Sequence, residues 1–352
     1  MSAGGAKRSA KGVQGKISAL VLQGGGALGA YELGVIERLY EEPGFDLRYV
    51  SGVSIGAITA AILVGPRNGD PLGTLRQLWD EFTVVSSPFL PDSVEATLAT
   101  FGNSAFYRPR SDYLAMPTWT SFYDVGPIRR RLAELVDFDA IRRSKVRLVV
   151  TATDVKSGTI DSFDNKDNNK PLTIDHILAS GSLPPGFPMT RIGEKTYWDG
   201  GLFNNTPLSP LMGLINADGE ADRTHVFVVN LFPNAGHIPQ NMIAVADRIV
   251  ELIFANKTKD DVKMAGTINR FVKLVEEMKE GRDREFGKLL EQDEYKDLTR
   301  FKAFANIVEI TNTRDEPVNA ASDFSEATIK ARIAAGYQDA DARLAEAKAA
   351  SR

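Results

Sequence analysis

The sequence predicts an α/β fold with a parallel sheet, and three observations lead to this prediction. Short apolar stretches with the composition of buried strands alternate with segments of helical periodicity. Glycine-rich turns connect each of the first two strand-like stretches to the helix-like segment that follows it. The chain has 352 residues and is 43% hydrophobic, so it is long enough to bury a sizeable core.

Five stretches are rich in apolar and β-branched residues, as buried strands are. They are residues 17–23, 47–52, 145–155, 225–233 and 305–311. Six segments between or after these stretches have the apolar spacing of helices. They are residues 30–42, 54–65, 72–84, 126–136, 173–183 and 325–350. The Pro184-Pro185 pair ends the fifth of these helices.

The composition changes near residue 235, where the alternation of strands and helices gives way to segments rich in Lys, Asp and Glu. We therefore expect a disordered tail over residues 1–16, an α/β domain over 17–235 and a mainly helical C-terminal extension over 236–352. In this interpretation the extension returns one strand, residues 305–311, to the sheet.

Charge and cysteine content exclude several functions. The chain has no cysteine, which excludes disulfides, thiolate metal sites and a cysteine nucleophile. Its formal net charge is −4, whereas general nucleic-acid binding needs a basic surface. No metal-ligand spacing such as H-E-x-x-H occurs, so we expect neither a metal nor a cofactor.

Two features bear on location. The first residues, MSAGGAKRSAKGVQGK, lack the apolar core of a signal peptide. The longest apolar run, residues 56–65, is shorter than the roughly 20 residues that span a bilayer. We therefore expect a cytoplasmic protein whose membrane contact, where it occurs, is peripheral.

A glycine-rich turn follows the first predicted strand. Residues 24–29, GGGALG, match the pattern G-x-G-x-x-G between a strand and a helix, as in a dinucleotide-binding turn. That function also needs an acidic residue about 20 positions later, at the end of the second strand, to bind the ribose. Asp46 has this spacing but precedes the strand, so the sequence favours another use of the backbone N–H groups.

The second predicted strand ends in a different turn. Gly52, Ser54 and Gly56 form the pattern G-x-S-x-G between an apolar strand and an apolar helix, the context of a nucleophile elbow. The helix dipole would stabilise negative charge that develops near the serine, and backbone N–H groups of the GGGALG turn could stabilise an oxyanion there. The simpler structural interpretation is that Ser54 only caps the helix.

A nucleophilic serine needs a general base, and the chain offers two kinds. Of its three histidines, His176 falls in a predicted helix, His225 opens a strand and His237 lies in the loop after that strand. His237 would complete a Ser–Asp–His triad in the chain order of α/β-hydrolases. The alternative base is Asp199, which follows a short apolar stretch and precedes two adjacent glycines.

Three motifs together resemble the patatin-like phospholipase family. In the family's order they are GGGALG (24–29) for the oxyanion loop, GVSIG (52–56) for the elbow and DGGLFNNTP (199–207) for the D-G-[GA] segment. ASGSLPPGFP (179–188) is also similar to the family's pattern. The resemblance covers about residues 17–232.

The resemblance implies a Ser–Asp dyad in a three-layer α/β/α domain with a central, mostly parallel sheet. Ser54 is then the nucleophile, Asp199 is the base, and backbone N–H groups of the glycine loop form the oxyanion hole. The glycines of this loop are Gly24, Gly25, Gly26 and Gly29. The implied activity is hydrolysis of a lipid or other acyl ester without a cofactor. The C-terminal helical stretch resembles an extension found on some bacterial members.

The chain departs from the family pattern in the glycine loop. It has Gln23 and Leu28 where the family often has Asp and a basic residue. The missing basic side chain weakens the expectation of a phospholipid substrate but does not affect the dyad. Phospholipids, lysophospholipids, neutral esters and acyl polymers are all candidate substrates.

Two other functions stay open: an esterase whose triad includes His237, and a cofactor- or acyl-binding protein in which Ser54 is only a cap. The aromatic segment 101–123 is interpreted either as a loop packed on the core or as a cap over an acyl cleft that also touches lipid. The arginine runs at 129–131 and 142–145 are either solvated or in contact with anionic headgroups.

Overall fold

The computed structural model describes residues 16–84, 103–232, 306–314 and 320–350, together with short stretches between 238 and 274 and two single residues, Phe304 and Glu316. Within these residues no helix has both the length and the apolar character needed to cross a membrane.

Eight strands form one central sheet in the described part of the chain, in the order β10-β9-β1-β2-β5-β8-β7, with β6 paired to β5. Their bounds are β1 Ile17–Leu22, β2 Leu47–Gly52, β5 Arg147–Asp154, β6 Ile160–Asp164, β7 Thr190–Ile192, β8 Lys195–Asp199, β9 Thr224–Asn230 and β10 Asn306–Thr311. The five strands from β10 to β5 are parallel, which confirms the predicted mostly parallel sheet.

An antiparallel edge, made of β6, β7 and β8, extends the sheet beyond β5. Sequence analysis did not predict these strands. All of β1 is buried, whereas β6 is mostly half-buried and contains more polar than apolar residues. Such short, partly polar strands lack the continuous apolar run that marks a strand covered on both faces.

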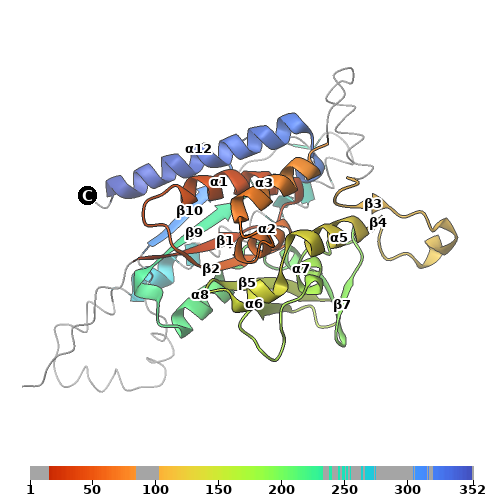
Figure 1. The fold of residues 1–352 in the computed structure, drawn as a ribbon, viewed down its shortest axis with the longest axis horizontal. Coiled ribbons are helices and arrows are strands. Elements are labelled where there is room, and N and C mark those ends of the chain that lie inside the picture. Colours follow the sequence, from red (N-terminus) through yellow and green to blue (C-terminus); the bar gives the residue numbers. More distant parts are fainter. Residues whose placement is uncertain are drawn as a thin grey trace, which may run out of the picture.

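Helices cover both faces of the sheet, which gives the expected three layers (Figure 1). They are α1 Ala30–Tyr40, α2 Ile55–Val64, α3 Pro71–Phe82, α5 Gly126–Leu135, α6 Phe138–Arg143, α7 Ile174–Ser180, α8 Leu208–Ala217 and α12 Glu326–Ala350. Leu20 and Leu22 of β1 pack into the core with α1 and α2. Their neighbours Ala19 and Val21 point to the opposite face and pack with α8.

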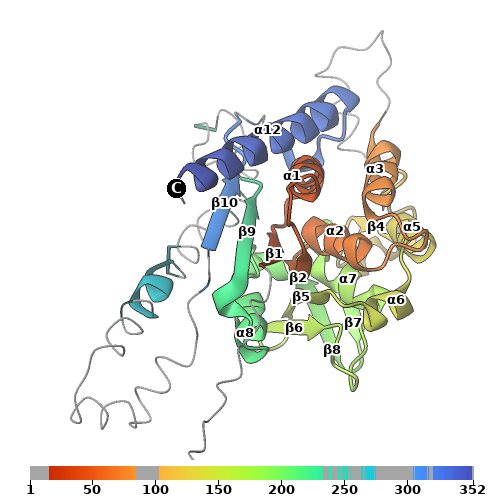
Figure 2. The same cartoon turned by 60° about the vertical axis from the view of Figure 1, so that its left-hand side comes forward.

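The C-terminal part of the chain packs directly on the N-terminal part. β10 adds a parallel strand to β9, in register from Asn306 opposite His225 to Thr311 opposite Asn230. α12 lies along α1 (Figure 2), and the Tyr31 hydroxyl donates a hydrogen bond of 2.8 Å to Asp339. The short helix η5 (Ala320–Ser322) contacts η1 (Gly26–Gly29), the turn that contains the glycine loop. The C-terminal segment therefore reaches the carboxyl edge of the sheet.

Candidate active site

The two glycine turns predicted from the sequence lie next to each other, because they follow the adjacent parallel strands β1 and β2. Ser54 follows β2 and directly precedes α2, with φ 55° and ψ −123°. It is the one non-glycine residue of the described chain with positive φ. A non-glycine residue keeps such a backbone only when its surroundings hold it there, and such residues concentrate at functional sites.

Two glycines make this sharp turn sterically possible. A Cβ atom on Gly52 would lie 2.2 Å from the carbonyl oxygen of Gly56. A Cβ atom on Gly56 would lie 2.6 Å from the carbonyl oxygen of Leu22, at the end of β1. The pattern G-x-S-x-G is therefore required here by the close passage of three backbone segments.

The glycine loop is fastened beside Ser54 by Asn205. Gly24 donates its N–H to Asn205 Oδ1 at 3.2 Å, and Asn205 Nδ2 donates to the carbonyl oxygen of Gly24 at 2.9 Å. The N–H groups of Gly25 and Gly26 take part in no hydrogen bond among the described residues, and both glycines line the cavity next to Ser54. Gly29 lies outside that lining and packs against Ile55 at the start of α2.

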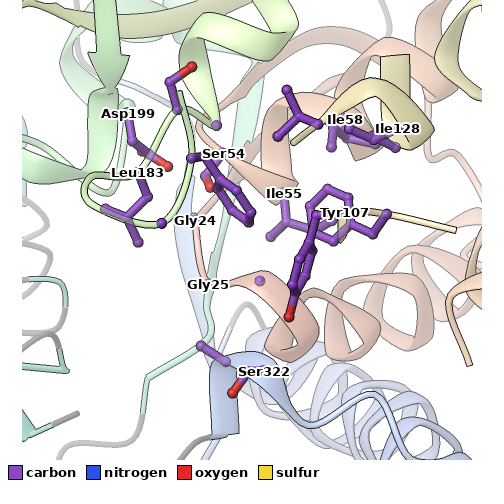
Figure 3. Close-up of a pocket in the computed structure, with 18 of the residues that line it drawn as sticks. Gly24, Gly25, Ser54, Ile55, Ile58, Tyr107, Ile128, Leu183, Asp199 and Ser322 are labelled. Atoms are coloured by element: carbon purple, nitrogen blue, oxygen red, sulfur yellow. The ribbon is translucent and has the colours of Figure 1, made fainter. Parts of the chain in front are cut away.

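Asp199 is the last residue of β8 and is 1% exposed. Its carboxylate accepts a hydrogen bond of 2.7 Å from the N–H of Gly201, and the side chain of Ser54 points toward it (Figure 3). Burial raises the pKa of Asp199 to about 7, while Gly201 and Ser54 lower it less strongly. The carboxyl group therefore changes its protonation state near neutral pH, which suits a general base.

Ser180 and Asn205 support the site, although sequence analysis assigned no role to either. The N–H of Ser54 donates to the side-chain oxygen of Ser180 at 3.0 Å and lies 3.1 Å from its carbonyl oxygen. Asn205 connects the glycine loop to the segment that begins at Asp199. The only signal in the sequence was their position inside the ASGSLPPGFP and DGGLFNNTP motifs.

Two of the three histidines, His176 and His225, lie in the described part of the chain. His176 is buried at the start of α7, where its Nδ1 accepts the N–H of Thr173 as part of a capping box. His225 is the second residue of β9, and burial lowers its pKa. Neither lines the cavity that contains Ser54. His237 lies outside the described residues, so its prediction is untested.

Ser54 and Asp199 lie at one end of an apolar cavity of about 350 Å³ (Figure 3). Four isoleucines and several aromatic rings form most of its wall. The apolar residues that line it are Ile55, Ile58, Phe106, Tyr107, Tyr123, Val125, Ile128, Ile177, Leu178, Leu183, Phe187, Phe232, Phe254 and Phe324. Phe106 and Tyr107 come from the aromatic segment predicted either to pack on the core or to cap a cleft. Tyr107 belongs to the core, Phe106 packs against it, and both line the cavity.

Residues from the C-terminal segment close the cavity on another side. Ala321, Ser322 and Phe324 line it, and Figure 3 shows Ser322 next to Gly25. Phe324 is fully buried and packs against Phe106 and Phe82. Among the residues that the structure describes, no cluster of His, Asp and Glu has the arrangement of a metal site.

Comparison with known proteins identifies the family. A model of the patatin-like phospholipase family matches residues 20–212, more than half of the chain. Triacylglycerol lipase 4 of Saccharomyces cerevisiae is 29% identical over 227 residues, which cover 57% of this chain and 23% of the yeast protein. The chain thus spans about a quarter of the length of this curated relative.

Two solved structures resemble the chain more distantly. VipD from Legionella pneumophila has a TM-score of 0.42 at 15% identity, over 94% of this chain and 67% of VipD. The type III effector ExoU, from Pseudomonas aeruginosa, has a TM-score of 0.39 at 13% identity, over 94% of this chain and 53% of ExoU. On the family match, which includes the glycine loop, the elbow and Asp199, the chain belongs to the patatin-like phospholipase family.

Proposed function

We propose that the protein is a lipid acyl-ester hydrolase in which Ser54 is the nucleophile and Asp199 the general base. One observation carries this proposal: the side chain of Ser54 points toward a buried carboxylate at one end of an apolar cavity (Figure 3). Nucleophile and base thus lie side by side, as this chemistry requires.

The reaction follows from this geometry. Asp199 accepts the hydroxyl proton as Ser54 Oγ attacks the ester carbonyl carbon. The oxyanion accepts hydrogen bonds from the free N–H groups of Gly25 and Gly26. The C–O bond to the alcohol then breaks, and the alcohol leaves with the proton held by Asp199. A water molecule, deprotonated by Asp199, attacks the acyl-serine ester and releases the fatty acid and the free serine.

Asn205 and Gly29 have supporting parts in this proposal. The N–H of Gly24 already donates to Asn205, and this bond holds the loop in position. The hydrogen bonds to the oxyanion then come from Gly25 and Gly26. Gly29 permits the close packing of the loop on Ile55. In this assignment, two of the four glycines expected from the sequence, Gly25 and Gly26, donate hydrogen bonds to the oxyanion.

The size and lining of the cavity support a fatty acyl chain as substrate. A cavity of about 350 Å³ with an apolar lining is suited to hold a fatty acyl chain. The lining contains no Lys or Arg among the described residues, and Leu28 is buried in the core. The described part of the lining therefore has no cationic side chain that could bind a phosphate group, which supports a neutral ester as the substrate. The name of the yeast relative, a triacylglycerol lipase, agrees with this preference.

The direct contact between Ser54 and Asp199 also supports a dyad over a triad, because an imidazole in a triad lies between serine and carboxylate. His237 then takes no part in the reaction. The apolar cavity likewise gives no support to a dinucleotide bound at GGGALG.

Turnover of nitrophenyl esters by the purified chain tests this proposal. We expect hydrolysis in the presence of a metal chelator, loss of activity in Ser54→Ala and no loss in His237→Ala. Esters of long acyl chains should react faster than acetate, and a diacylglycerol should be preferred to a phospholipid of the same chains. Full activity in a folded Ser54→Ala variant, or dependence on His237, would overturn the assignment.

A further inference from the structure

A loop between two short strands extends away from the body of the molecule (Figure 1). It connects β3 (Arg108–Pro109) to β4 (Tyr123–Asp124), and we call residues 110–122 the β3–β4 loop. Four large apolar side chains of this loop are exposed to solvent: Tyr113 (65%), Leu114 (103%), Met116 (52%) and Phe122 (59%). Exposed apolar side chains gathered at one protruding tip mark an interaction site rather than ordinary surface.

Internal hydrogen bonds of the loop hold it in this shape. The N–H of Ala115 donates to the carbonyl oxygen of Asp112 at 2.8 Å, and the N–H of Trp119 donates to that of Met116 at 3.1 Å. Arg110 pairs with Asp112 and lies over the Trp119 ring, 4.9 Å from its centroid. These contacts occupy polar groups within the loop. Tyr113 lies against the Trp119 ring, with 6.1 Å between the centroids, while Leu114 and Met116 are exposed in the described part of the chain.

The base of the loop is continuous with the wall of the cavity. Tyr107 and Tyr123, which flank the loop, both line the cavity. The N–H of Phe122 donates to the carbonyl oxygen of Pro185 at 3.1 Å, and that of Tyr123 to the oxygen of Gly186 at 2.9 Å. Pro185 and Gly186 line the cavity as well. A surface that the tip enters therefore lies next to the cavity that we propose binds the acyl chain.

Arginines lie at the base of the loop and in α5, the helix that follows it. Four of them pair with carboxylates: Arg108 with Asp124, Arg110 with Asp112, Arg129 with Asp175 and Arg131 with Glu81. Arg130 is exposed and has no ion pair among the described residues, so it is available to an acidic lipid headgroup. In a lipid surface the acyl chains lie beneath the charged headgroups. Apolar side chains at the tip of the loop and arginines near its base follow the same order.

We propose that the β3–β4 loop inserts the side chains of Leu114, Tyr113 and Met116 into an anionic lipid surface and so places the cavity over its substrate. This inference rests on the proposed acyl-ester hydrolase function. A lipid surface fits the loop better than a folded protein partner, because a stable protein interface buries about 1,600 Å², far more than a few side chains of one narrow loop provide. A lipid surface accepts single inserted side chains.

Vesicle binding by the full chain with Ser54→Ala, which leaves the lipid intact, tests this inference. We expect stronger binding to vesicles of phosphatidylcholine with phosphatidylserine than to phosphatidylcholine alone, and weaker binding as salt rises. Adding Leu114→Ser and Met116→Ser should reduce binding at least tenfold, since burying one leucine contributes about 1.5–3 kcal/mol. The matched control is Leu274→Ser, at a position that is 54% exposed later in the chain.

The absence of cysteine permits a second, independent measurement. In Leu114→Cys an environment-sensitive dye can be attached at a single position, and in Leu274→Cys the same dye reports on the control surface. On anionic vesicles we expect the emission to shift to shorter wavelength at position 114 only. It should also be quenched there by lipids labelled in the acyl chain.

Three results would overturn the inference: no vesicle binding by the parent protein, equal binding after the two serine substitutions, or no emission shift at position 114. The proposed hydrolase function is tested separately with a soluble short-chain ester. The variant with Leu114→Ser and Met116→Ser, carrying Ser54, should hydrolyse this ester at the parent rate. Lack of turnover in the parent would refute the hydrolase function, whereas the vesicle measurements would still decide on lipid binding.

Discussion

The buried carboxylate of Asp199, at the end of β8, faces the side chain of Ser54, which follows β2 and precedes α2. The strand β5 lies between these two strands in the sheet. The pair is therefore assembled by the order of the strands and not by a local motif. The burial that shields the pair from water also raises the pKa of Asp199 to about 7.

The raised pKa of Asp199 predicts how stability depends on pH. In the unfolded chain its pKa is near 4, so between about pH 4 and 7 the folded chain holds a proton that the unfolded chain releases. The stability from this group is fully present below about pH 4 and is lost as pH rises through about 7. In Asp199→Asn nothing ionises at this position. We expect the free energy of unfolding of the wild type to fall relative to that of the variant over this range, by roughly 4 kcal/mol in total.

Urea unfolding of both proteins at pH 4, 6 and 8 measures this difference. Parallel pH dependence of wild type and Asp199→Asn would show that Asp199 has an ordinary pKa in the folded chain.

The contact between the glycine loop and the C-terminal segment predicts a selective loss of activity. Gly26 has φ +56°, and a Cβ atom on it would lie 2.3 Å from the carbonyl oxygen of Ala321. Gly26→Ala should displace the oxyanion donors and lower kcat for a soluble ester about 10²-fold. Gly44→Ala is the matched control, since Gly44 also has positive φ (+85°) but nothing within 4 Å. Both variants should lose about 1 kcal/mol of stability through backbone strain, but only Gly26→Ala should lose activity. Equal kcat in the two variants would contradict this account.

The wall formed by Phe324 predicts a change in chain-length preference. Phe324→Leu enlarges the cavity, so we expect the optimum among nitrophenyl esters to move to longer acyl chains. Phe82→Leu is the control, because Phe82 is equally buried and packs on Phe324 without lining the cavity. Both variants should lose about 1–2 kcal/mol of stability. An unchanged optimum in Phe324→Leu would show that the C-terminal segment does not shape the acyl site.

A buried ion pair anchors the C-terminal segment. Arg332 of α12 lies 2.7 Å from Glu316 and donates a hydrogen bond of 3.1 Å to the carbonyl oxygen of Asp323, and both charged side chains are nearly inaccessible. Arg332→Met leaves Glu316 buried and unpaired, which should cost about 3–5 kcal/mol of unfolding free energy. Arg343→Met removes an exposed pair with Glu346 and should cost less than about 1 kcal/mol. Similar urea midpoints of the two variants would argue against this anchoring role.

The parallel half of the sheet and the two glycine turns could be predicted from sequence, because both leave local patterns. The parallel strands are rich in apolar and β-branched residues, and each turn has glycines at fixed spacing. The antiparallel strands β6 to β8 could not, since they are short and half-polar and depend on pairing with β5 for their structure.

The candidate site was predictable in its motifs but not in its supporting contacts. Ser54 and Asp199 stood out because the resemblance to a family gave their motifs a meaning. Asn205 and Ser180 act through contacts with residues far away in the sequence, and such contacts leave no local pattern. Phe324 is an extreme case, because it lies outside the motifs, in the predicted C-terminal extension, and still lines the cavity.

The rate at which a fluorophosphonate probe modifies Ser54, measured against pH in the wild type and in Asp199→Asn, tests the central claim most directly. The probe reacts with an activated serine, and peptide mass identifies the residue that carries it. The dyad predicts modification of Ser54 at a rate that rises with pH through about 7, as Asp199 loses its proton. It also predicts a loss of about 10²-fold or more in Asp199→Asn. Modification of another residue, or an equal rate in Asp199→Asn, would contradict the dyad.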